Sequence, residues 1–156
     1  MSLGEQLIDA LRSGASGEVS SEADGMRVKA EVVGSGPYGS DLRALEVERT
    51  APLGDTRKAG RLSEAVEAIG DRLTYLPEKL EVLESDGGSG RAVLRTRRKQ
   101  VQGREYYEVQ VDGGDRVDVR RYRGRSESGG RDAVVENFGH GVLRRLVDDL
   151  GEILSD

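Results

Sequence analysis

Residues 104–123 decide the fold, and they read REYYEVQVDGGDRVDVRRYR. On each side of the central Asp112-Gly113-Gly114-Asp115 group, apolar residues alternate with polar ones: Tyr107, Val109 and Val111 before it, Val117 and Val119 after it. Alternation is typical of a half-buried strand, and a glycine turn between two such runs is typical of a hairpin. The stretch therefore predicts two antiparallel strands, with Tyr107 in the core and Tyr106 and Tyr122 pointing outward.

Upstream, the same alternation predicts further strands. Asp24-Gly25 is a strong two-residue turn signal between residues 18–23 and 26–33. Residues 42–49 suit a third strand, although Leu42 and Ala44 lie out of phase with Leu45 and Val47. Residues 79–84 and 91–98 are expected to form another hairpin around the turn at 85–90.

Three segments have helical spacing instead. Ser2 and Glu5 form a capping-box signature before an apolar face that ends near Gly14. A second helix is expected over about residues 61–74, ended by Pro77. The last helix starts near Gly139 and carries a wide apolar stripe: Leu143, Leu146, Val147, Leu150 and Leu154.

Length and composition set the class of protein. A chain of 156 residues with 35% hydrophobic residues is expected to form one domain with its own core. The absence of Cys and the single His exclude thiolate chemistry and a multi-His zinc site within one chain. No apolar run of 18 residues and no signal-peptide pattern is found, so a cytoplasmic protein is expected.

These features together predict a single α+β domain over residues 1–156, with a flexible loop at about 123–131. We expect a twisted antiparallel sheet with amphipathic helices packed on one face, in the order α-βββ-α-ββ(ββ)-α. We expect no cofactor and no metal.

The basic residues are unevenly placed. The formal net charge is −5, yet residues 91–131 are rich in arginine. Cations interleaved with aromatic rings are typical of surfaces that bind single-stranded nucleic acid. The candidate anion-binding residues are Arg95, Arg97, Arg98, Arg120, Arg121, Tyr122 and Arg123. The alternative is a solvated strand face whose arginines guard an edge or bridge to acidic groups.

Three further motifs have a functional and an ordinary interpretation. Residues 34–39 match G-x-G-x-x-G, but the preceding strand is amphipathic and belongs to a hairpin, which favours a plain loop over a dinucleotide site. Asp148, Asp149 and Glu152 offer carboxylates for Mg²⁺ or a solvated helix face. His140 is either an acid–base group or a polar residue at a helix start.

In chain order, the expected elements resemble the small α+β fold of type III secretion chaperones over nearly the whole chain. The segment from Arg72 to Tyr122, with RLTYLPE at its start, REYYEV in its middle and RRYR at its end, is similar to uncharacterised bacterial proteins of like length. The resemblance implies an acidic homodimer that holds partner segments on apolar patches and sheet edges. The pI of about 5.1 agrees, whereas the basic stretch departs from the pattern.

The expected function is therefore a non-enzymatic protein-interaction or chaperone-like module. We expect it to form a homodimer and to bind an unidentified protein partner. Leu143, Leu146 and Leu150 are the candidate partner surface, unless the protein's own core uses that stripe. The alternative function is an RNA- or polyanion-binding module that uses the basic strands of residues 91–125.

Overall fold

The computed structural model describes residues 1–96, 105–125 and 129–155. The helices are Leu3–Arg12 (α1), Asp55–Gly60 (α2), Leu62–Arg72 (α3) and His140–Leu154 (α4). The strands are Gly17–Ala23 (β1), Met26–Ser35 (β2), Gly39–Arg49 (β3), Leu80–Asp86 (β4), Arg91–Thr96 (β5), Glu105–Asp112 (β6), Arg116–Gly124 (β7), Arg131–Val134 (β8) and Glu136–Gly139 (β9).

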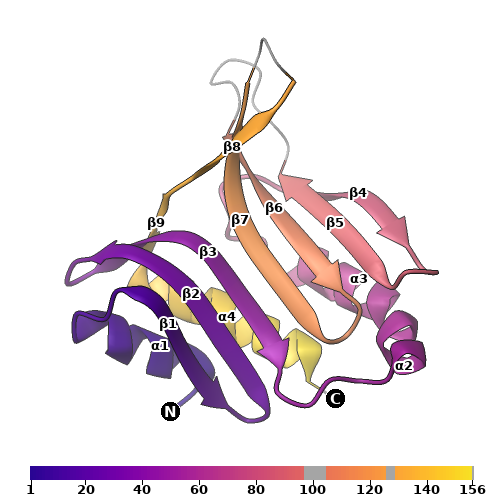
Figure 1. Ribbon diagram of the computed structural model, residues 1–156, viewed down its shortest axis with the longest axis horizontal. Coiled ribbons are helices and arrows are strands. Elements are labelled where there is room, and N and C mark those ends of the chain that lie inside the picture. The colour runs from indigo at the N-terminus through magenta and orange to yellow at the C-terminus, as the bar shows by residue number, and fades with distance from the viewer. Residues whose placement is uncertain (97–104, 126–128, 156) are drawn as a thin grey trace.

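The strands form one antiparallel sheet in the order β1-β2-β3-β7-β6-β5-β4. β8 adds to the end of β7, and β9 adds to the start of β3. The helices lie behind one face of this sheet, and the other face is open toward the viewer in Figure 1. The predicted α+β class is therefore confirmed.

The core lies between the sheet and the helices. The apolar stripe of α4 is fully buried there, together with Leu7 and Leu11 of α1 and Val28 and Val47 of the sheet. The predicted cap of α1 is present, because the Glu5 amide donates to Ser2 Oγ at 3.1 Å. The three predicted helices are thus present, and the apolar residues whose 3.6-residue spacing indicated them face the core.

A bulge explains the phase change that the sequence showed in β3. Glu31 pairs with Ala44 and Val32 pairs with Leu42, so Arg43 has no partner residue on β2. One extra residue moves the side chains that follow it to the opposite face. Leu42 and Leu45 therefore both face the core although they are three residues apart.

Three features of the fold were not predicted. The sequence assigned residues 132–138 to no element, yet the structure has β8 at Arg131–Val134 and β9 at Glu136–Gly139. β3 and β7 pair with each other only between Leu45–Glu48 and Arg116–Val119. The start of β3 pairs with β9 instead, and the end of β7 pairs with β8. The short helix α2 precedes the predicted second helix.

Candidate functional site

The predicted partner surface on α4 is part of the core. Leu143, Leu146 and Leu150 each have 0% of their surface exposed. Their side chains are covered because α4 packs against α1, α3 and β3. Of the two interpretations, the structure agrees with use of the stripe by the protein's own core, so these three residues offer no surface to a partner.

The predicted anion-binding residues do not converge on one face. Strand alternation places Arg95, Arg120 and Tyr122 on the open face, and Arg121 and Arg123 on the opposite face. Arg97 and Arg98 lie outside the described residues. Because side chains on one strand alternate between faces, a run of arginines there divides between two surfaces.

Each described arginine of this set also contacts a carboxylate. Arg95 Nε lies 2.9 Å from Glu108, and Arg120 Nε lies 3.1 Å from Asp118. The pairs on the other face are Arg121 with Glu136 at 3.0 Å and Arg123 with Glu105 at 2.7 Å. Each described arginine of this set is therefore paired with an acidic group on its own strand or on a nearby strand.

The open face carries a row of alternating charge that crosses the sheet from edge to edge. Paired residues on successive strands form this row: Glu22 on β1, Arg27 on β2, Glu48 on β3, Arg116 on β7, Asp112 on β6, Arg91 on β5 and Asp86 on β4. Arg27 bridges to Glu22 at 2.8 Å and to Glu48 at 3.0 Å. Arg116 and Arg91 each lie 3.8 Å from Asp112. We call this the long row, and it ends in a carboxylate at both edges.

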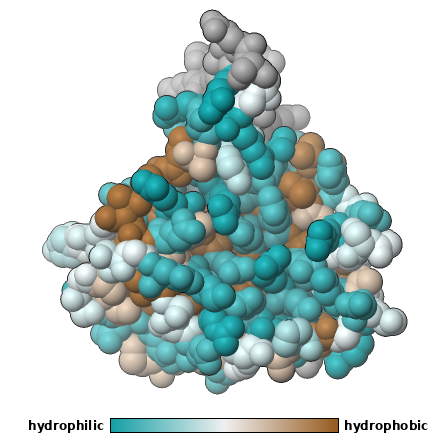
Figure 2. Space-filling model, in the orientation of Figure 1, coloured by the Kyte–Doolittle hydropathy of each residue, from teal (hydrophilic) through white to brown (hydrophobic). Residues whose placement is uncertain are grey.

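A shorter row runs parallel to it. Its members are Arg120 on β7, Glu108 on β6, Arg95 on β5 and Glu81 on β4. Signs alternate again, and the residue at the β4 edge is again acidic. Opposite charges on neighbouring strands stabilise their pairing, so both rows reinforce this strand order. Figure 2 shows the resulting hydrophilic surface across the open face.

Glu108 is the buried centre of the short row, with 3% of its surface exposed. Burial raises the pKa of this carboxyl, but hydrogen bonds from Arg131, Gln110 and Arg95 outweigh burial, and the pKa lies below its usual range. Arg131 Nη1 on β8 lies 2.7 Å from Glu108 Oε1. The carboxylate therefore joins β5, β6 and β8.

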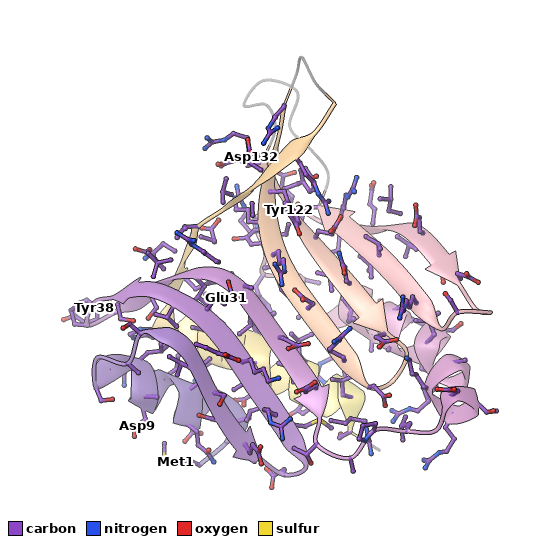
Figure 3. The ribbon with its side chains drawn as sticks, viewed as in Figure 1. Met1, Asp9, Glu31, Tyr38, Tyr122 and Asp132 are labelled. Carbon is purple, nitrogen blue, oxygen red and sulfur yellow. The ribbon has the colours of Figure 1, made fainter. Side chains whose placement is uncertain are left out.

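The tyrosines beside Glu108 are covered rather than free. Tyr106 points to the open face as predicted, yet it is only 2% exposed. Its ring lies 6.0 Å from that of Tyr122, the Arg95 guanidinium lies over it at 5.1 Å, and Arg131 covers Tyr122 at 3.8 Å. Figure 3 labels Tyr122 on β7. Nucleic-acid bases need open ring faces, and this cluster has cations on them already.

His140 has a serine partner that the sequence did not reveal. Its Nε2 lies 2.9 Å from Ser40 Oγ, which lies 2.8 Å from Ser35 Oγ. Ser40 is 0% exposed and His140 is 3% exposed. Burial, with the nearby Arg12 charge, lowers the pKa of His140, against a smaller raising effect of the Pro37 carbonyl. A serine hydroxyl that no substrate can reach does not act as a nucleophile, so this chain of hydrogen bonds joins β2, β3 and α4.

The remaining predicted motifs have structural partners. Asp148 accepts hydrogen bonds from Ser2 Oγ and the Gly4 amide, and Asp149 accepts them from Arg72 and Tyr75. Within the described ranges, no three His, Cys, Asp or Glu side chains are grouped to hold a metal. Residues 34–39 connect β2 to β3 and lead into a strand rather than a helix, as the ordinary interpretation of the glycine motif expects.

β4 lies at one of the two edges of the sheet, and β1 lies at the other. β4 pairs with β5 on one side, and every β4 residue after Leu80 is exposed. Val82 and Leu83 have 54% and 51% of their surface exposed, and Leu83 forms a bulge. Figure 2 shows apolar surface on the side of the molecule that β4 occupies in Figure 1. Exposed apolar side chains on an unpaired edge mark a surface for strand pairing.

No family model, curated protein or solved structure matches this chain. In the part of the chain that the structure describes, no helix is long and apolar enough to cross a membrane.

Proposed function

We propose that this chain is a non-enzymatic, chaperone-like protein-interaction module that accepts an extended segment of another protein at the free edge of β4. The observation that carries this proposal is that, among the described residues, β4 pairs with β5 alone, with Val82 and Leu83 more than half exposed on it. Strand addition uses backbone hydrogen bonds for affinity and side-chain contacts for selectivity.

The two faces of the sheet are less suited to a partner than this edge is. The face behind the sheet is covered by the apolar stripes of the helices. The open face is laced with the ion pairs of the two rows, which would have to lose water and partners to bind a flat surface. An added strand at β4 disturbs neither face.

The alternative, an RNA- or polyanion-binding module, has less support. Its arginines divide between two faces and contact carboxylates, as described above. A salt titration of binding to single-stranded RNA tests it, because binding through several phosphates weakens steeply with salt.

The homodimer remains a prediction. Since Leu143, Leu146 and Leu150 are buried, any dimer interface must use other residues than this stripe. Light scattering at high micromolar concentration tests the prediction, and a monomeric mass would contradict it.

Selection from a phage-displayed library of random dodecapeptides tests the edge directly. We expect enriched peptides to bind the wild type and to protect β4 amides from hydrogen exchange. Binding should be lost in a Val82→Lys/Leu83→Lys variant and kept in a matched control, Val33→Lys/Val135→Lys, which alters two exposed valines elsewhere. Peptides that bind both variants equally, or an absence of enrichment, would overturn the proposal.

A further inference from the structure

We infer that the segment added to β4 carries two basic residues four positions apart. The first and third of the three residues between them are apolar and face the core side of the sheet. This inference rests on the proposed strand addition at β4 and specifies the chemistry of the partner. It is argued from the order of charges across the open face and from the inner face of β4.

The two charge rows reach β4 with the same sign. From β7 to β4 the long row reads Arg116, Asp112, Arg91 and Asp86. Over the same strands the short row reads Arg120, Glu108, Arg95 and Glu81. The sign changes at each strand, so a cation in the next position would continue both rows. Directly opposite charges stabilise a strand pair, and like charges destabilise it.

The spacing of the two cations follows from β5, which already pairs with the same carboxylates. Arg91 lies opposite Asp86 and Arg95 lies opposite Glu81, four residues apart on a strand without a bulge. Between them, Ala92 and Leu94 point inward to the core. A regular strand on the other side of β4 would meet the same two carboxylates with the same four-residue spacing.

The inner side of β4 requires apolar neighbours. Val82 pairs with Leu94 and so faces the same side as the core, yet over half of its surface is exposed. A valine or leucine on the added strand would cover this side chain and remove apolar area from water. The pattern of β5, basic-apolar-x-apolar-basic, therefore describes the partner segment as well.

Charge disfavours a second copy of this chain in the register that would pair the two exposed apolar residues with each other. If two β4 strands paired antiparallel about the point between Val82 and Leu83, Glu81 of one copy would lie opposite Glu84 of the other. Two carboxylates at that distance repel each other. The β4 edge thus favours a basic segment from another protein.

Three capped heptapeptides test this inference: Thr-Lys-Val-Thr-Val-Lys-Thr and its analogues with Gln or Glu in place of both Lys. We expect the Lys peptide to bind more tightly than the Gln peptide by about fivefold, since it gains two exposed ion pairs that each add modestly to affinity. The Glu peptide should bind most weakly, and the differences should shrink at high salt. The readout is an NMR titration with hydrogen exchange of the β4 amides.

Two variants separate the charge effect from the edge. Glu81→Gln/Asp86→Asn should remove the preference for Lys, whereas Glu22→Gln, at the β1 end of the long row, should keep it. If all three peptides protect β4 equally, strand addition stands and the charge inference is overturned. If none protects β4, both the inference and the proposed function are overturned.

Discussion

At the scale of single residues, Glu108 shows what a buried charge requires from its neighbours. It is a buried carboxylate held by Arg95, Arg131 and Gln110. Glu108→Gln would leave two guanidinium groups without their charge partner, and breaking a largely buried pair is costly. We expect a loss of about 2–3 kcal/mol in the free energy of unfolding by urea. Glu18→Gln on the same face, exposed and without such partners, should change it by less than about 0.5 kcal/mol.

His140 gives a pH dependence whose sign follows from its environment. Because burial lowers its pKa below 6.5 in the folded protein, the unfolded chain takes up a proton first as the pH falls. The stabilising effect of neutral His140 is therefore complete above pH about 6.5 and is lost as the pH falls toward the lowered value. Urea unfolding between pH 7.5 and 5 should show this loss, and His140→Gln should flatten it. An equally steep loss in the variant would assign the effect to other groups.

At the scale of elements, the turn between β6 and β7 is held by α2. Gly113 has φ +56°, and a Cβ there would collide with the Lys58 carbonyl oxygen. Gly113→Ala therefore combines backbone strain with a backbone clash, and we expect a loss of more than about 2 kcal/mol. Gly25→Ala separates the two causes, because Gly25 has φ +79° but open space around it. It should lose only about 1 kcal/mol in the same thermal or urea unfolding measurement. Equal losses would mean that α2 does not constrain the turn.

The elements that the sequence predicted are those with local signals. Asp24-Gly25 forms the expected turn, with Asp24 at φ 53°, and the stripe of α4 has the expected spacing. β8 and β9 had no such signal, because each is only four residues long and owes its pairing to the separation of β3 from β7. The Arg43 bulge was visible only as a change of phase.

The same distinction holds for the candidate surfaces. Alternation correctly assigned Tyr107 to the core. The charge rows could not be predicted from the sequence, because their residues come from strands that are distant in the chain. The long row, for example, contains both Glu22 and Asp86. The order of the strands, which no single strand encodes, places the arginines of the basic stretch opposite carboxylates on neighbouring strands. For the same reason Ser40, 100 residues from His140, was not recognised as its partner.

At the scale of the whole molecule, both free edges of the sheet end the long row with a carboxylate, Glu22 on β1 and Asp86 on β4. Natural proteins place charges on edge strands to prevent sheets from pairing with one another. Removing acidic groups from β4 should then allow two molecules to pair edge to edge through Val82 and Leu83. We expect Glu81→Gln/Glu84→Gln to raise the weight-average mass above that of the wild type in sedimentation velocity, increasingly with concentration. Glu46→Gln, on the interior strand β3, should not. If the β4 variant sediments like the wild type at every concentration, charge is not what keeps this edge unpaired, and the exposed valine and leucine must be tolerated there for another reason.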